Sequence, residues 1–330
     1  MISRGTARAI GGGAGAALLS AVLFGASTPL AKLLLSGIDP WMLAGTLYLG
    51  SGVGLAVLRT VAAPSRVRAF DTRVRGRSWL SLGAAILSGG ILAPVLLMVG
   101  LARTSAATAA LLLNLESVFT VLFAWLVFGE NLGRRITVGV AAIVCGGAIL
   151  GGVGDRLTGD WLGPAIIAAA CLAWAIDNNL TRNVSSADPV YIATLKGGIA
   201  GIVNVAIARY LGSPWPGGAA LSAALLLGFA GYGVSLVLFV IALRHAGVAR
   251  TAAYFSLAPF FGGVLAVVVF RETVTLSLLA AGLLMAVGVW LLLTERHEHE
   301  HWHGAAPGGT RGDARHTHPH YPDSDHRHGH

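Results

Sequence analysis

Ten long apolar segments, separated by short polar connections, occupy most of this 330-residue chain. An α-helix needs about 20 apolar residues to cross the hydrocarbon core of a bilayer, which is about 30 Å thick. Each segment is about that long, so the sequence predicts an all-α membrane protein with ten transmembrane helices. Because the connections are short, neighbouring helices must run antiparallel. The helices are expected at residues 10–35, 40–58, 79–101, 105–128, 136–153, 161–180, 189–211, 219–243, 248–270 and 274–293.

Few charged residues are available to cover a water-facing surface. Asp, Glu, Lys and Arg make up 12% of the chain, about half of the roughly 25% found in soluble domains. This shortage argues against a soluble enzyme, a nucleic-acid-binding protein and a disordered scaffold. The net charge is +8, but the arginines lie between apolar segments. The expected surroundings are therefore a lipid bilayer, and neither nucleic acid nor a resident cofactor is expected as a partner.

The distribution of arginines predicts how the helices are oriented. Cytoplasmic loops of membrane proteins carry an excess of Lys and Arg. If the N-terminus is cytoplasmic, most loop arginines face the cytoplasm, including several between residues 59 and 77. The opposite side then holds only Arg103, Arg156, Arg209 and Arg271. We therefore expect both termini in the cytoplasm and the chain in the inner, or plasma, membrane.

The composition changes after residue 293. Residues 294–330 are polar and hold ten of the eleven histidines, so we expect a disordered cytoplasmic tail that cannot bury enough apolar surface to fold alone. Imidazoles alternating with other polar groups are suitable ligands for zinc, nickel, cobalt or copper. Weak metal binding is expected at His297, His299, His301, His303, His316, His318, His320, His326, His328 and His330.

The apolar body contains an internal repeat. Leu101, Phe119 and Glu130 have counterparts 142 positions later, and the segment from Phe24 to Lys32 matches the segment from Trp174 to Arg182. Five helices per copy put the second copy into the membrane in the opposite orientation, as in many secondary transporters whose substrate site lies at the repeat interface. The expected divisions are an N-terminus at 1–9, repeats at 10–153 and 161–293, a linker at 154–160, and the tail at 294–330.

The repeated residues resemble a known family. The segment Leu101-Ala-Arg-Thr-Ser-Ala-Ala-Thr-Ala109, and the partner segment Leu257-Ala-Pro-Phe-Phe261 with Glu272 after it, are similar to the repeat signature of EamA-type proteins of the drug/metabolite transporter superfamily. The resemblance implies a ten-helix inner-membrane carrier for metabolites or drugs, often acting outward. The first repeat has Glu116-Ser117 where the second has Ala258-Pro259. Because the family favours Pro in both copies, the fourth helix is expected to be unkinked.

Polar residues within apolar segments are the candidate site residues. An ionisable side chain at mid-membrane costs roughly 2.5–3.5 kcal/mol on insertion scales, so it usually faces a cavity or a partner. Glu116 lies midway along 105–128 with Asn114 beside it, and Lys196 lies within 189–211. Glu116 and Lys196 could form a structural ion pair, or one could gain and lose a proton as substrate is carried.

A second group lies nearer the ends of its helices. Asp177, Asn178 and Lys32 could form a gate or a ring around substrate, or they could extend to the membrane surface as snorkelling side chains. Trp174 and Tyr254 could line a pocket for an apolar or aromatic solute, or they could pack against other helices or lipid.

These features favour a secondary transporter rather than an enzyme. We expect an exporter of a small metabolite or drug that works by alternating access, with proton coupling through Glu116. The tail leaves a divalent transition-metal exporter or metal-responsive carrier open, and a membrane enzyme or a non-transporting metal sensor is the alternative of a different class. Gly147-xxx-Gly151 and Gly197-xxx-Gly201 suit close helix packing within a protomer or between two protomers of a homodimer.

Overall fold

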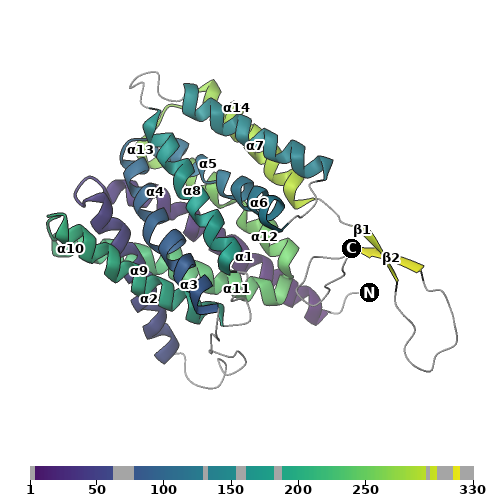
Figure 1. Ribbon diagram of the computed structural model, residues 1–330, viewed down its shortest axis with the longest axis horizontal. Coiled ribbons are helices and arrows are strands. Elements are labelled where there is room, and N and C mark those ends of the chain that lie inside the picture. The colour runs from purple at the N-terminus through teal and green to yellow at the C-terminus, as the bar shows by residue number, and fades with distance from the viewer. Residues whose placement is uncertain are drawn as a thin grey trace.

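The computed structural model describes residues 4–61, 78–128, 133–153, 161–181, 188–294, 298–302 and 315–319. Helices packed side by side account for nearly all of them (Figure 1). In chain order the elements are α1 (Arg4–Leu34), α2 (Pro40–Val61), α3 (Ser78–Ala85), η1 (Ile86–Leu92), α4 (Ala93–Ala102), α5 (Ala106–Leu112), α6 (Leu115–Phe128), α7 (Arg134–Val153), α8 (Leu162–Thr181), α9 (Pro189–Tyr210), α10 (Gly218–Gly228), η3 (Phe229–Val234), α11 (Ser235–Ala246), α12 (Val248–Phe255), α13 (Ala258–Phe270), α14 (Leu276–Leu293), β1 (Glu298–Trp302) and β2 (Arg315–Pro319).

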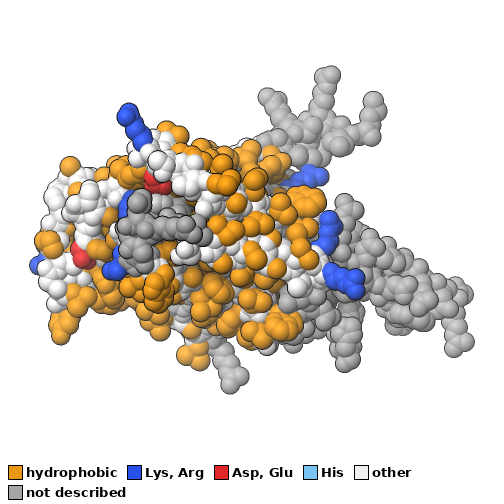
Figure 2. All heavy atoms as spheres, turned by 90° about the horizontal axis from the view of Figure 1, so that it is seen from above, with side chains coloured by type: hydrophobic (Ala, Val, Ile, Leu, Met, Phe, Trp, Pro, Cys, Tyr) orange, Lys and Arg blue, Asp and Glu red, His pale blue; other side chains and the backbone are white. Residues whose placement is uncertain are grey.

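The outer surface of the helices is apolar. Within the described ranges, nine helical stretches are long and apolar enough to span a membrane. Many of their large side chains point outward, as do Leu126, Val268 and Leu276. Figure 2 shows the resulting apolar surface, with Lys and Arg side chains gathered toward its two ends. The remaining expected span corresponds to α8, which has 20 residues but ends in the polar run Asp177-Asn178-Asn179.

Glycines allow the most closely packed helices to approach one another. A Cβ atom on Gly25 of α1 would lie 2.1 Å from the carbonyl oxygen of Ala258 in α13. A Cβ on Gly197 of α9 would lie 2.8 Å from the backbone nitrogen of Gly52 in α2, and α2 and α9 form the most extensive helix pair. Small residues permit such contacts between membrane helices. Gly197 and Gly201 therefore pack α9 against α2 within one protomer.

Two expected spans are each divided by a tight turn. The expectation that helix 105–128 runs unkinked is wrong, since α5 ends at Leu112 and α6 begins at Leu115. No proline is needed there, because the amide groups of Leu113 and Asn114 bond to carbonyls three residues back. The side chain of Asn114 also donates to Leu111 O at 2.9 Å. The matching span 248–270 divides at Ser256 and Leu257, between α12 and α13.

Two other spans contain π-helical turns. Residues 79–101 fold as α3, η1 and α4, and residues 219–243 fold as α10, η3 and α11. Each π turn contains two glycines, and α4 continues with Pro94 at its second position. Such turns shift the hydrogen-bonding register of a helix and are frequent at functional sites.

Two short strands, β1 and β2, lie within the tail that the sequence predicts to be disordered. β1 and β2 pair antiparallel, with Glu298 opposite Pro319 and Trp302 opposite Arg315. Backbone pairing does not itself require an apolar core, although an isolated two-stranded ribbon is only marginally stable in water. The rest of the expected tail beyond residue 294 lies outside the described residues.

Candidate functional site

An ion pair joins α8 to α9 inside the helix bundle. Lys196 Nζ lies 2.6 Å from Asp177 Oδ1 and 2.5 Å from Asp177 Oδ2. Thr181, one turn further along α8, donates its hydroxyl to Asp177 Oδ1 at 3.0 Å. The Asp177 side chain is 7% exposed and that of Lys196 is 18% exposed. The charged atoms of this pair therefore satisfy each other in a largely water-free setting.

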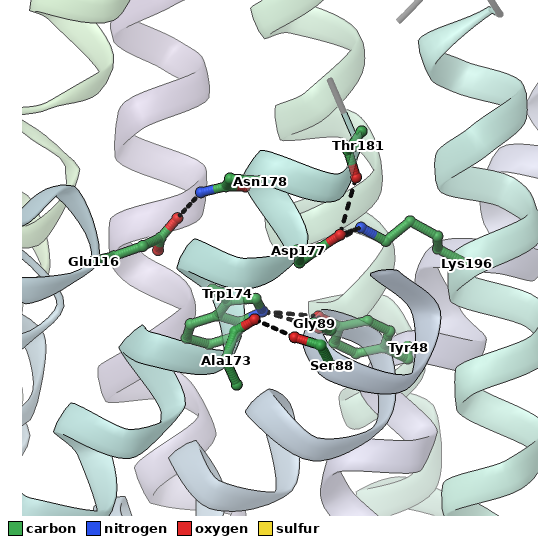
Figure 3. A network of polar contacts seen from close by, with 10 residues as sticks. All are labelled: Tyr48, Ser88, Gly89, Glu116, Ala173, Trp174, Asp177, Asn178, Thr181 and Lys196. Atoms are coloured by element: carbon green, nitrogen blue, oxygen red, sulfur yellow. Dashed lines mark hydrogen bonds and ion pairs between the residues drawn. The ribbon is translucent and has the colours of Figure 1, made fainter. Parts of the chain in front are cut away.

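Glu116 of α6 is held by an uncharged partner. Asn178 Nδ2 donates to Glu116 Oε1 at 2.7 Å, and Figure 3 shows the two side chains pointing toward each other from separate helices. A direct ion pair between Glu116 and Lys196 does not form, because Lys196 contacts Asp177 on the neighbouring helix instead. The structure thus brings Glu116, Asp177, Asn178 and Lys196 into one polar cluster, on α6, α8 and α9.

The π turn η1 supplies acceptors to this cluster. The amide of Ala93 bonds to Ser88 O rather than Gly89 O, and Pro94 has no amide hydrogen to offer the preceding turn. Gly89 O is consequently free to accept the Tyr48 hydroxyl and the Trp174 indole Nε1, both at 2.9 Å. Figure 3 shows both rings converging on this carbonyl.

Two further polar contacts fix η1 against its neighbours. Asn204 of α9 donates to Gly90 O at 3.3 Å, and the Ser88 hydroxyl donates to Ala173 O of α8. Gly89 also leaves room for the ion pair, because a Cβ atom there would lie 2.0 Å from Asp177 Oδ2.

Four residues of this region, Tyr48, Ser88, Gly89 and Thr181, were not among the residues expected from sequence. The adjacent glycines Gly89 and Gly90, shortly before Pro94, are the sequence feature that could have indicated an irregular turn at η1.

Lys32 lies outside this cluster and binds the end of a helix. Its Nζ donates to Leu101 O at 2.5 Å, Ala102 O at 3.2 Å and Thr104 O at 3.0 Å. These carbonyls lie at and just beyond the C-terminus of α4, where a cation is favoured. Lys32 therefore fastens α1 to the connection between α4 and α5.

Glu272 fastens the other side of the same connection. Its carboxylate accepts the amide of Ala106 at 2.8 Å and the amide of Ala107 at 3.1 Å, at the N-terminus of α5. Arg271, just before it, has left-handed backbone with φ of 52°, which ends α13 and turns the chain. The connection between α4 and α5 is thus held from one side by Lys32 of α1 and from the other by Glu272, just after α13.

Aromatic side chains form a continuous row beside the polar cluster. Trp174 Nε1 lies 3.4 Å from the Tyr48 hydroxyl, and the Tyr48 and Tyr232 rings are 5.8 Å apart between centroids. Phe24 continues the row, 5.9 Å from Tyr232 and 5.3 Å from Phe255. All five are only partly buried. Trp174 is the only one of the two expected pocket residues in this row of described side chains, since Phe255 and not Tyr254 contacts Phe24. The expectation that either residue lines a pocket stays a prediction.

Asn114 does not contact the polar cluster, and the described residues offer no metal site. Asn114 is buried, bonds within its own turn and lies 3.9 Å from Met285 Sδ. No group of three or more His, Cys, Asp or Glu side chains placed to hold a metal ion occurs among the described residues. The side chains of the ten tail histidines from His297 to His330 lie outside the described part of the chain. The metal-exporter alternative gains no support.

Comparisons with known proteins agree with the membrane-spanning fold. The EamA-like transporter family matches residues 11–152 and again residues 161–294. An uncharacterized transporter of Methanothermobacter thermautotrophicus is 28% identical over 295 residues, covering 83% of this chain and 84% of the relative. A solved crystal structure is similar in fold, with a TM-score of 0.60, 21% identity, and coverage of 84% of this chain and 95% of its own.

Proposed function

This chain belongs to the EamA-like transporter family, and from that membership we propose that it is a secondary carrier that exports a small metabolite or drug by alternating access. The family assignment covers both halves of the helical body and makes the chain a multi-pass membrane transporter. The family membership, rather than any single residue, is the main support for the carrier function. The proposed location is the plasma membrane, with both termini in the cytoplasm.

We propose that the carrier consists of two inverted repeats of five spans each. Two separate matches to one family support this arrangement. Corresponding interruptions support it as well, since each half contains a π turn followed by a span divided near its middle. In this arrangement α8 is the first span of the second repeat, and its polar end faces the protein interior rather than lipid.

The polar cluster on α6, α8 and α9 is the proposed substrate and coupling site. Glu116, Asp177 and Lys196 place three ionisable groups between apolar helices, where such groups usually serve transport or proton transfer. Glu116 would take up a proton when substrate leaves and release it when substrate binds. Lys32 and Glu272 both fasten the α4–α5 connection. In this conformation they would close the substrate pathway at the end that lies away from the polar cluster.

A flux assay on purified protein in liposomes tests this proposal. A pH-sensitive dye such as pyranine is sealed inside, and amino acids, sugar derivatives and aromatic amines are added in turn under a pH gradient. A carrier should move protons only with particular solutes, and wild-type flux should respond to the pH gradient. Failure of every solute class to move would contradict the carrier function.

The substitution Glu116→Gln separates coupling from folding. It keeps an acceptor for Asn178 but cannot carry a proton, so flux should be lost or become independent of the pH gradient. Asp39→Asn is the matched control, since Asp39 Oδ1 accepts the amide of Trp41 at the start of α2 and Asn is an equally good helix cap. Normal, pH-dependent flux in Glu116→Gln protein would refute the coupling role.

A further inference from the structure

The charges of the polar cluster do not balance. Glu116 and Asp177 contribute two carboxylates, and Lys196 contributes one ammonium group. Lys196 contacts both oxygens of Asp177, whereas Glu116 has only the neutral amide of Asn178 and makes no ion pair with any described residue. The other lysine, Lys32, is occupied by carbonyls at the end of α4. When all three groups are ionised, one negative charge remains uncompensated.

An uncompensated carboxylate between membrane helices favours a cationic ligand. Leaving such a charge without a partner in an apolar environment is costly. A ligand with one positive charge would compensate it without disturbing the ion pair of Asp177 and Lys196. Glu116 is only partly buried and Asn178 is exposed, so the described helices do not enclose this pair of side chains on every side.

The neighbouring groups are suited to the body of an organic cation. Trp174 and Asn178 are four residues apart on α8, which puts the indole ring and the partner of Glu116 on one face. Tyr48 is bonded to the same carbonyl as Trp174, that of Gly89, and the Cβ position of Gly89 lies beside the Asp177 carboxylate. The faces of aromatic rings attract cations, and most strongly organic ones that are weakly hydrated. Tyr232 and Phe24 continue the aromatic row beyond Tyr48.

We infer that the transported solute is an organic cation with a single positive charge on an aromatic or apolar body. Glu116 compensates its charge, and the row from Trp174 through Tyr48 and Tyr232 contacts its body. The inference rests on the proposed carrier function, since it assigns a substrate class to the same cluster. If the inference is right, the net charge of the cluster determines which solutes bind. Substitutions can make that charge more negative or less negative.

Three probes that share a benzyl group test the substrate class on the full-length protein. Benzyltrimethylammonium is a permanent cation, benzylsulfonate a permanent anion and benzyl alcohol neutral. Calorimetric titration of wild-type protein should show benzyltrimethylammonium binding at least about tenfold more tightly than the other two, which equals about 1.4 kcal/mol. Equal or tighter binding of benzylsulfonate or benzyl alcohol would overturn the inference.

Variants of the cluster test whether charge is the cause. Glu116→Gln removes the excess charge and should weaken cation binding by about tenfold or more, while Glu116→Asp should retain it. The double variant Glu116→Gln with Lys196→Met leaves Asp177 uncompensated and should recover cation binding. No loss in Glu116→Gln, or no recovery in a double variant that elutes and melts like wild type, would count against the charge rule.

Two outcomes separate this inference from the carrier function. Cation-selective binding without flux of labelled benzyltrimethylammonium or of any other solute class into liposomes would preserve the ligand class and contradict the carrier. Saturable flux of benzylsulfonate alone would preserve the carrier and contradict the cation class. If Glu116→Gln protein does not fold, Lys196→Met gives the reciprocal test. Removing the ammonium group leaves a second excess carboxylate, Asp177, so cation binding should become tighter. Unchanged or weaker cation binding in Lys196→Met protein would overturn the inference.

Discussion

At the scale of single residues, Gly89 and Pro94 determine how the polar cluster is assembled. Pro94 cannot donate a backbone hydrogen bond, and the π turn before it redirects the amide of Ala93 to Ser88 O. Gly89 O is left for Tyr48 and Trp174, while the absent side chain of Gly89 leaves space for Asp177. One short segment of α3–η1–α4 thus positions an aromatic pair and accommodates an ion pair.

The first prediction concerns Gly89→Ala. The added methyl group would lie 2.0 Å from Asp177 Oδ2, so either the carboxylate or η1 must move. We expect a loss of about 1–3 kcal/mol in the free energy of unfolding, the usual effect of overpacking, together with weaker binding at the cluster. Thermal unfolding in detergent measures the first effect and calorimetric titration the second.

Gly83→Ala is the control for that prediction. Gly83 belongs to the same span, but a Cβ atom there would have no neighbour within 4 Å. Since Ala is a better helix former than Gly, the control should be neutral or stabilising by up to about 1 kcal/mol. Equal behaviour of the two variants would show that space beside Asp177 is not limiting.

At the scale of helices, the sequence was sufficient to locate the long apolar helices but not to predict their contacts. Long apolar segments bounded by arginines define where helices begin and end, and those ranges agree with the described helices within a few residues. The partner of Lys196 depends on how α8 and α9 are rotated and displaced relative to each other. Hydropathy contains no such information, and Asp177 rather than Glu116 proved to be the partner.

The hydropathy pattern also did not predict where helices are interrupted. The break before α6 was not expected because proline is absent there, yet Asn114 and three-residue hydrogen bonds produce it. The role of Lys32 was hidden for a related reason. Its partners are backbone carbonyls of α4, which all residue types share and which no motif reveals.

The second prediction concerns the contact between α1 and the end of α4. Lys32→Met would remove the ammonium group that donates to the carbonyls of Leu101, Ala102 and Thr104. We expect a loss of about 1–3 kcal/mol in the free energy of unfolding, the usual contribution of hydrogen bonds that involve a charged group. Lys32→Arg keeps several donors and should restore most of the stability. Unchanged melting temperature in the Lys32→Met protein would contradict a fastening role.

The third prediction concerns the crossing of α1 and α13. Gly25→Ala would place a methyl group 2.1 Å from Ala258 O and should lower the melting temperature by several degrees, since overpacking of this kind costs about 1–3 kcal/mol. Gly15→Ala lies on the same helix with no neighbour within 4 Å and is the matched control. Similar melting temperatures for both variants would show that the crossing can widen freely.

At the scale of the whole molecule, the number of spans decides whether two inverted repeats exist. Nine described stretches qualify as spans by length and composition, and α8 is the candidate for a tenth. If α8 is counted, each family match contains five spans, and the proposed second repeat would enter the membrane from the opposite side. Figure 1 draws the first turns of α1 and the last turns of α14 toward the same end of the bundle, in agreement with an even number.

The fourth prediction tests α8 directly with reporter fusions. Alkaline phosphatase, active only outside the cytoplasm, should be active when fused at position 158 and inactive at position 185, because α8 lies between them. Green fluorescent protein, which fluoresces in the cytoplasm, should be fluorescent when fused at either end of the helical body. The same activity at positions 158 and 185 would leave α8 outside the membrane and the two ends in different compartments. The five-plus-five arrangement would then be wrong, and the cluster around Glu116 would no longer lie between two inverted halves.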